Sequence, residues 1–278
     1  MKTKSNKALW ILAAVAVLGA MGCCALAVVG AVTVPAIAWG TDAGGVRLRP
    51  FWVDLPGREV TEQVEQTFEV GSTPRLEIDS FAGATTIRAG RDGVIHVLAT
   101  KHARGQSSLD AIVVELTQKG DRVQIRTSHP ALRSSGNQRV DLEITVPANT
   151  DLGLKLGAGS VEVRDLLGAQ HIEAAAGGIT IRGAAGPVSA TASVGGIDYE
   201  GRPAGTCRFE AAAGGIVLRL PADANITVDL SAGLGGVRTT LPVDGTVTLR
   251  SVRGIIGTGD QASLTARVGV GGVDLLRQ

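Results

Sequence analysis

The chain contains the stretch Glu173-Ala-Ala-Ala-Gly-Gly-Ile179 and repeats it at Glu210-Ala-Ala-Ala-Gly-Gly-Ile216, an offset of 210 − 173 = 37 residues. A weaker copy, Ser193-Val-Gly-Gly-Ile197, lies halfway between the two. The period is therefore about half of that offset, and a short fixed period is typical of proteins in which each repeat stacks on the next. We predict an all-β fold, a single-stranded β-solenoid similar to a β-helix, with repeats of about 18–19 residues over residues 151–278.

One glycine in each repeat defines the expected register. Each precedes a short alternating apolar run such as Ile179-Thr-Ile181 or Ile216-Val-Leu218, and a two-residue period indicates a strand with one buried face. We expect the residues after these glycines to stack as one interior ladder, about 4.8 Å per step. The glycines, at successive differences of 19, 18, 19, 21, 18 and 18, are Gly159, Gly178, Gly196, Gly215, Gly236, Gly254 and Gly272, and the expected ladder is Ile179, Ile197, Ile216, Val237, Ile255 and Val273.

Residues 60–150 show longer alternating runs separated by turn residues and polar segments. We expect this part to start and cap the solenoid, because a terminal element of this kind covers strand edges that a bare repeat would expose. The expected pieces are a degenerate first repeat at Leu76–Ile87, a hairpin of Thr86–Arg88 with Val94–Val97, a hairpin of Ile112–Thr117 with Val123–Thr127, a strand at Arg139–Val146, and polar loops at Lys101–Asp110 and Ser128–Gln138.

The N-terminus carries a separate signal. Three lysines within residues 1–7 precede an uncharged apolar stretch over residues 8–39, longer than the roughly 20 residues that cross a bilayer. We predict a cytoplasmic N-terminus at 1–7, a single transmembrane helix at 8–39, a linker at 40–59 and a C-terminal domain outside the cytoplasm. Two other interpretations stay open, cleavage of a signal peptide after Ala38 and lipidation of Cys23, and both also place the domain outside the cytoplasm.

Composition excludes several classes of function. The net charge of +1 over 278 residues gives no footprint for nucleic acid. The Gly-Gly pairs are followed by neither a Gly-Lys-Ser/Thr motif nor a helical pattern, so they do not form a phosphate loop. The four histidines lack metal-ligand spacing with Cys, Asp or Glu. Cys207 stands alone in the domain, and we interpret it as a small buried apolar residue. We predict no catalytic, cofactor-binding or metal site.

The order of three motifs resembles a known family. Leu76-Glu-Ile-Asp79 with Gly83-x-x-x-Ile87 is followed by alternating Val140–Pro147 and then by repeated Gly-Gly-Ile/Val-x-Leu/Ile units. Over residues 60–278 this order is similar to the DUF4097 family of β-strand repeat proteins, sometimes called putative adhesins. The resemblance implies a bacterial, membrane-attached protein, and it brings no functional residues with it.

These features lead to three functional hypotheses. The first is a membrane-anchored, extracytoplasmic binding or structural module of the envelope, adhesin-like and without catalysis, whose partner is an envelope protein or a glycan. The second is a sensor or regulatory partner of a membrane-stress or export system. The third, a glycan-active β-helix enzyme, needs clustered carboxylates and aromatic platforms, whereas aromatic residues are 3% of this chain.

An arginine recurs near one position of several repeats. Such a series can bind a ligand through the outer face of the repeats, or it can simply keep that face soluble, and the sequence leaves both interpretations open. The candidates for surface binding are Arg164, Arg182, Arg219 and Arg238.

The sequence also makes a prediction about the last repeat. Val273-Asp-Leu-Leu-Arg-Gln278 follows directly on a repeat glycine, so we expect a final strand with an open edge. We expect Arg277 to blunt this edge and the protein to be a monomer. The alternative is an edge-paired dimer that a charge at Leu275 would abolish.

Overall fold

A computed structural model describes the backbone of residues 36–42, 45–51, 59–129 and 138–278, and the side chains of the last two ranges. The chain divides into two units, Met1–Val53 and Asp54–Gln278. In the first unit, strand β1 (Ala36–Asp42) pairs antiparallel with β2 (Gly45–Phe51).

This pair of strands corrects part of the N-terminal interpretation. The sequence predicts residues 36–39 as the end of the membrane helix and residues 40–51 as part of a linker. The overlooked signal is Val46 and Leu48 alternating with Arg47 and Arg49, the period of a strand. Residues 8–35 of the predicted helix lie outside the described residues. Within the part of the chain that the structure describes, no helix has the length and apolar character needed to cross a membrane.

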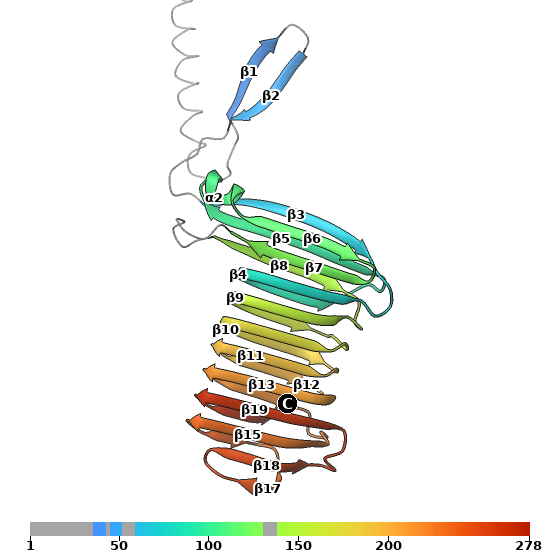
Figure 1. Cartoon of the computed structure of the whole chain (residues 1–278), viewed down its shortest axis with the longest axis vertical. Coiled ribbons are helices and arrows are strands. Elements are labelled where there is room, and N and C mark those ends of the chain that lie inside the picture. The colour runs from blue at the N-terminus through green and yellow to red at the C-terminus, as the bar shows by residue number, and fades with distance from the viewer. Residues whose placement is uncertain (1–35, 43–44, 52–58, 130–137) are drawn as a thin grey trace, which may run out of the picture. The chain divides into compact units, whose positions relative to one another are not determined.

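In its described residues, the second unit is one continuous sheet with one short helix (Figure 1). Its elements in chain order are β3 (Glu59–Glu69), β4 (Arg75–Ala89), β5 (Val94–Arg104), α2 (Gln106–Asp110), β6 (Val113–Lys119), β7 (Arg122–Ser128), β8 (Arg139–Val146), β9 (Asp151–Arg164), β10 (Gln170–Ala184), β11 (Val188–Val194), β12 (Ile197–Gly201), β13 (Gly205–Ala213), β14 (Ile216–Leu220), β15 (Ile226–Leu234), β16 (Val237–Thr239), β17 (Asp244–Val247), β18 (Ser251–Ile256), β19 (Ala262–Val270) and β20 (Val273–Arg277).

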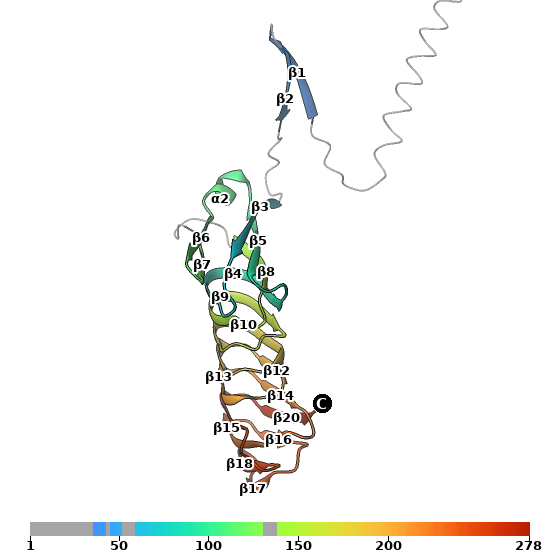
Figure 2. The same cartoon turned by 90° about the vertical axis from the view of Figure 1, so that its right-hand side faces the viewer.

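Each pass of the chain forms a layer of two strand segments that meet at a corner. First segments pair in parallel with first segments, and second segments with second segments: β10 pairs with β9 on one side and with β11 and β12 on the other. Figure 2 shows β13 and β15 on one side of this stack and β12, β14 and β20 on the other. Ile179 lies opposite Ile197, and Ile197 opposite Ile216, all three of them buried. The expected interior ladder is confirmed for these residues.

The last layers do not stack in chain order. Strands β13 and β14 pair with β19 and β20, which in turn pair with β15 and β16, so the layer β19–β20 lies between two layers that precede it in the sequence. Figure 1 shows β19 between β13 and β15. Val273 and Val237 are both buried members of the interior ladder, as expected, but they are direct neighbours there, whereas the expected order places Ile255 between them. The open edge expected after residue 273 is wrong, because β20 has a neighbour on each side and Leu275 is buried.

The repeat expected at Gly254 is also wrong. Strand β18 runs antiparallel to β15, placing Gly254 opposite Val228, and β17 pairs antiparallel with β18. Because this reversal turns the strand over, Ile255 is 41% exposed and does not join the interior ladder. The pair β17–β18 closes the stack beyond β15.

The opposite end of the stack is built from longer strands. Strand β4 pairs in parallel with β9 along both segments, which confirms the degenerate first repeat, and the hairpin β6–β7 is confirmed. The hairpin expected between β4 and β5 is wrong, because β8 lies between them, antiparallel to β5 and parallel to β4. The segment expected as a polar loop at 101–110 contains the end of β5 and the helix α2.

The interior of the layers contains both small and large buried side chains. Among the large buried residues, Tyr199 and Phe209 pack against each other with ring centroids 4.9 Å apart. Cys207 is fully buried beside them, and burial raises the pKa of its thiol. This confirms the interpretation of Cys207 as a small buried apolar residue.

Candidate binding surface

The structure brings only some of the four predicted arginines together. Arg164 lies directly opposite Arg182 in the neighbouring layer. The next residue in this row is Glu200, which is followed by Arg219. Arg238 lies opposite Asp274 and therefore belongs to a different row. The arginines thus form an interrupted row and not a continuous basic strip.

Two of these arginines are engaged within the fold. Arg164 donates from Nε to Glu162 Oε1 at 2.8 Å, and Arg219 pairs with Asp198 in the adjacent layer. The hydrogen bond and charge of Asp198 raise the pKa of Arg219. Within the described residues, the side chains of Arg182 and Arg238 make no hydrogen bond or ion pair. Arg182 and Arg238 are therefore the two members of the series that are available to a ligand.

A second surface feature lies at the corner between the two segments of each layer. Two consecutive residues point outward there, and the chain then turns at a glycine of positive φ, such as Gly177 (φ 127°), Gly195 (φ 140°) or Gly214 (φ 147°). Gly159 lies opposite Gly177, so the series predicted from Gly159 was shifted by one residue at that point. Backbone bonds close the corner, for example Gly195 N to Ala213 O at 2.9 Å. The corner therefore presents side chains and few free backbone groups.

The residue immediately before each corner glycine forms an exposed apolar row. We call its large members, Val194, Val270 and Leu234, the corner ridge; they are 60%, 54% and 62% exposed. Ala213 lies between Val194 and Val270, and Leu234 follows Val270 in the next layer. The row begins with alanines in the layers nearer the N-terminal end, Ala82, Ala158 and Ala176.

A shallow groove runs beside the corner ridge. Two hollows of about 410 and 550 Å³ share Thr191 and Ser193 and together extend from β4 to β15. At about 4.8 Å per layer, six steps between seven layers give a groove of about 29 Å. Small residues form much of its lining, among them Gly157, Ala175, Ser193, Ala212 and Gly269.

The wall of the groove opposite the ridge is a row of mostly charged residues. Lys155 and Glu173 face each other at 3.4 Å, and the pKa of Glu173 is lowered chiefly by its hydrogen bond with His171. Glu210 pairs with Arg208 at 3.3 Å. The row consists of Asp79, Lys155, Glu173, Thr191, Glu210 and Arg267. The groove therefore has one apolar and one polar wall, an amphipathic arrangement that neither composition nor periodicity predicted.

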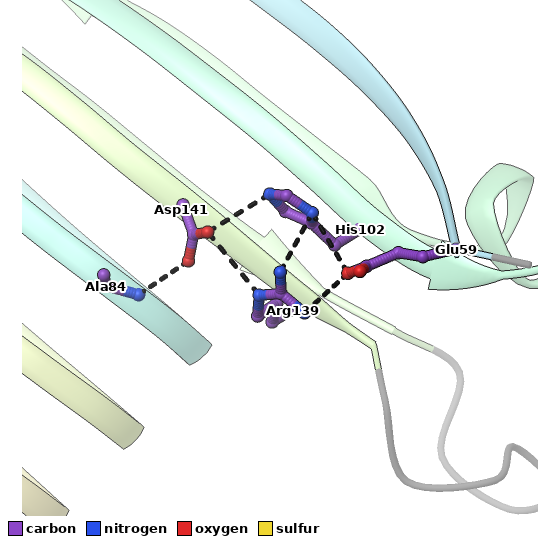
Figure 3. Close-up of polar contacts among 5 residues, drawn as sticks. All are labelled: Glu59, Ala84, His102, Arg139 and Asp141. Atoms are coloured by element: carbon purple, nitrogen blue, oxygen red, sulfur yellow. Dashed lines mark hydrogen bonds and ion pairs between the residues drawn. The ribbon is translucent and has the colours of Figure 1, made fainter. Parts of the chain in front are cut away.

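A cluster of polar residues lies at the N-terminal end of the stack, where β8 approaches β4 near Ala84 (Figure 3). Arg139 contacts Glu59 at 2.7 Å and Asp141 at 3.5 Å, and His102 Nε2 lies 3.1 Å from Asp141. Asp141 Oδ1 also accepts the backbone N–H of Ala84 at 2.8 Å. These residues come from β3, β5, β8 and β4, so the cluster joins four strands and its polar groups are engaged by one another. It stabilises the cap.

Replacing Asp141 by Ala should lower the free energy of unfolding by about 1–2 kcal/mol, because it leaves the N–H of Ala84 and two cationic or ring donors without their acceptor. Urea unfolding followed by circular dichroism measures this loss. Glu143→Ala, two residues along the same strand and outward-facing, is the matched control and should change stability by less than about 0.5 kcal/mol. Equal stability of the two variants would show that the cluster adds nothing.

No group of three or more His, Cys, Asp or Glu residues with the geometry of a metal site occurs among the residues described.

No family model and no curated protein matches the chain. Among solved structures, a putative cell adhesion protein from Clostridium sporogenes is 13% identical, with 78% of this chain and 100% of that chain covered and a TM-score of 0.52. A putative adhesin from Bacteroides fragilis is 12% identical (77% and 96% covered, TM-score 0.31), and a putative lipid binding protein from Parabacteroides distasonis is 11% identical (81% and 99% covered, TM-score 0.30). At these identities the likeness to the Clostridium protein shows a related fold. The two lower scores support no argument about this chain.

Proposed function

We propose that the chain is a membrane-anchored β-solenoid of the DUF4097 type that binds a partner outside the cytoplasm, in an adhesin-like role without catalysis. The apolar segment at 8–35 is the anchor, residues 60–150 cap the solenoid, and the layers of residues 151–278 carry the binding surface. The related fold of the Clostridium cell adhesion protein supports this role.

The observation that carries the proposal is the corner ridge beside its groove. Isolated apolar side chains are common on protein surfaces, whereas aligned ones next to a hollow mark a site of interaction. Val194, Val270 and Leu234 lie on a continuous hydrogen-bonded sheet, so their positions are set before a partner arrives. Little conformational entropy is then lost on binding.

The chemistry of the two walls favours a protein segment as the partner over a glycan. Sugar rings stack on aromatic side chains, and Phe81 is the one aromatic residue that lines the groove in the described part of the chain. An extended or helical segment with one apolar side fits a surface that is apolar on the ridge and polar on the opposite wall. Glu173 and Glu210 are held by Lys155 and Arg208, so they serve as counter-ions in that wall.

The test compares cells that carry the full chain with cells that carry the triple variant Val194→Ser, Leu234→Ser and Val270→Ser. The probe is adherence to cells of the same strain that lack the protein. Loss of three apolar contacts at about 1 kcal/mol each should reduce adherence at least tenfold. The control replaces exposed apolar residues away from the corner, Val113→Ser and Leu167→Ser, and should adhere like the parent. Equal adherence of the triple variant, at equal surface amount, would contradict the proposal.

A further inference from the structure

The layer β19–β20 lies between two layers that do not pair with each other. We call this position the slot: it lies between β13 and β14 on one side and β15 and β16 on the other. Neither β13 nor β14 pairs with β15 or β16 in the described structure, and every strand of the slot pairs with β19 or β20 instead. The far end of the stack is therefore joined to the remainder by this one layer and by the chain segment after β14.

The slot matches the inserted layer on both sides. Strand β19 pairs in parallel with β13 and with β15 over its whole length, and Phe209, Ala266 and Leu230 lie side by side. Leu264, Ala266 and Leu275 of the inserted layer are fully buried. Each layer carries the same small-residue corner and the same alternating pattern. The β19–β20 layer therefore fits the slot through the register of its backbone hydrogen bonds and through these buried side chains.

The strands that form the slot all precede its occupant in the chain. The edges of β13, β14, β15 and β16 that face the slot therefore have no partner within the chain until residues 262–277 have been made. The pairing of Gly205 with Ala262 joins positions much farther apart in the sequence than the pairing of Ile179 with Ile197, which links two layers that are consecutive in the chain. Edges that stay unpaired while the chain continues are templates for strands from other chains.

The inserted layer is reached through a tight connection. Strands β18 and β19 both pair with β15, from opposite sides, so residues 257–261 pass across the start of β15. Gly257 (φ 66°) and Gly259 (φ 75°) adopt positive φ there. A Cβ at Gly257 would lie 2.0 Å from Asn225 Oδ1, and one at Gly259 would lie 2.4 Å from Ile255 Cγ2. This connection acts as the hinge on which the layer closes into its own chain.

We propose that the slot also accepts the β19–β20 layer of a second copy of this chain, so that two copies form a dimer by exchanging this layer. The exchanged dimer keeps every strand pairing of the monomer, and the two states differ only in the hinge and in the concentration of copies. This surface is distinct from the corner ridge, because the strand edges that take part are buried in the closed form.

The first test traps the exchanged pairing in the full chain. One tagged copy carries Glu210→Cys and a second, differently tagged copy carries Arg267→Cys, both with Cys23→Ser, Cys24→Ser and Cys207→Ala, so that each copy has a single thiol. Residues 210 and 267 are direct neighbours across β13 and β19, at a separation that a disulfide can span. Unfolding and refolding the two copies together should give a mixed disulfide dimer. The control pair Glu210→Cys with Arg250→Cys should give none. Absence of the mixed dimer in the first pair, or an equal amount in the control pair, would overturn the proposal.

The second test shortens the hinge. Deletion of residues 258–260 prevents a chain from crossing its own β15, so the main species should shift from monomer to dimer in size-exclusion chromatography with light scattering. A folded monomer would overturn the proposal. If this variant does not fold, the disulfide experiment, which keeps the natural hinge, still decides.

Discussion

Replacing Gly195 by Ala should destabilise the folded chain by about 4 kcal/mol, in part because a φ of 140° is a conformation that non-glycine residues adopt only at a cost of about 1–3 kcal/mol. The added Cβ would also lie 1.8 Å from the carbonyl oxygen of Gly177 in the layer before it. Backbone atoms at that distance cannot rotate away as a side chain can. The two layers must therefore separate at the corner or the turn must change. Chemical unfolding followed by far-UV circular dichroism measures the loss.

The next residue supplies the control. At Gly196 the φ angle is not in the positive range that excludes side chains, and a Cβ would lie 3.5 Å from Gly215 O, an ordinary contact. Gly196→Ala should therefore change stability by less than about 1 kcal/mol. If both substitutions had the same effect, the conformation of the corner would not be the cause.

Sequence patterns predict the layers of this chain well because the interactions that define a layer are short in sequence. Ile179, Ile197 and Ile216 recur with glycine turns and a two-residue alternation, and both signals act within one repeat. The pairing of each layer with the next then follows from the nearly constant length of the repeat. The register of β10 to β14 was therefore accessible from the sequence, whereas the glycine series places β9 one residue out of register.

The place of the last layer was not accessible from the same pattern. The motif Gly271-Gly272-Val273 fits any position in the stack, because all corners look alike in sequence. One signal was present: the interval from Gly215 to Gly236 is longer than every other interval in the glycine series. The extra residues lengthen the connection after β14. This longer connection lets β15 lie two layers from β13 instead of one, and the space between them is the slot.

The surface was predicted less well than the core. The period of Arg164, Arg182 and Arg219 is visible in the sequence, but their availability depends on Glu162 and Asp198, whose positions follow from strand pairing. The corner ridge has a signal in the sequence, an apolar residue directly before each corner glycine. Its exposure is not evident from alternation, because two consecutive residues point outward at the corner.

Replacing Ile216 by Asp should have a comparable or larger effect, about 5 kcal/mol or more. Ile216 is fully buried between Ile197 and Val273, and a carboxylate there would have only apolar neighbours in its ladder. Such a loss is close to the whole stability of many domains, so the variant should be largely unfolded at room temperature. All three tryptophans, Trp10, Trp39 and Trp52, precede the stack, so circular dichroism is the suitable probe.

The conservative variant Ile216→Val separates charge burial from loss of volume. It removes one methylene from the same ladder position and should cost about 0.5–1.5 kcal/mol. Because Ile216 lies opposite Val273 of the inserted layer, the folded Ile216→Val variant should hold β20 less firmly against β14 on that side of the slot. Hydrogen exchange should then show lost protection in β20 before β9 or β10, whereas uniform loss along the whole stack would mean that the layers unfold as one unit.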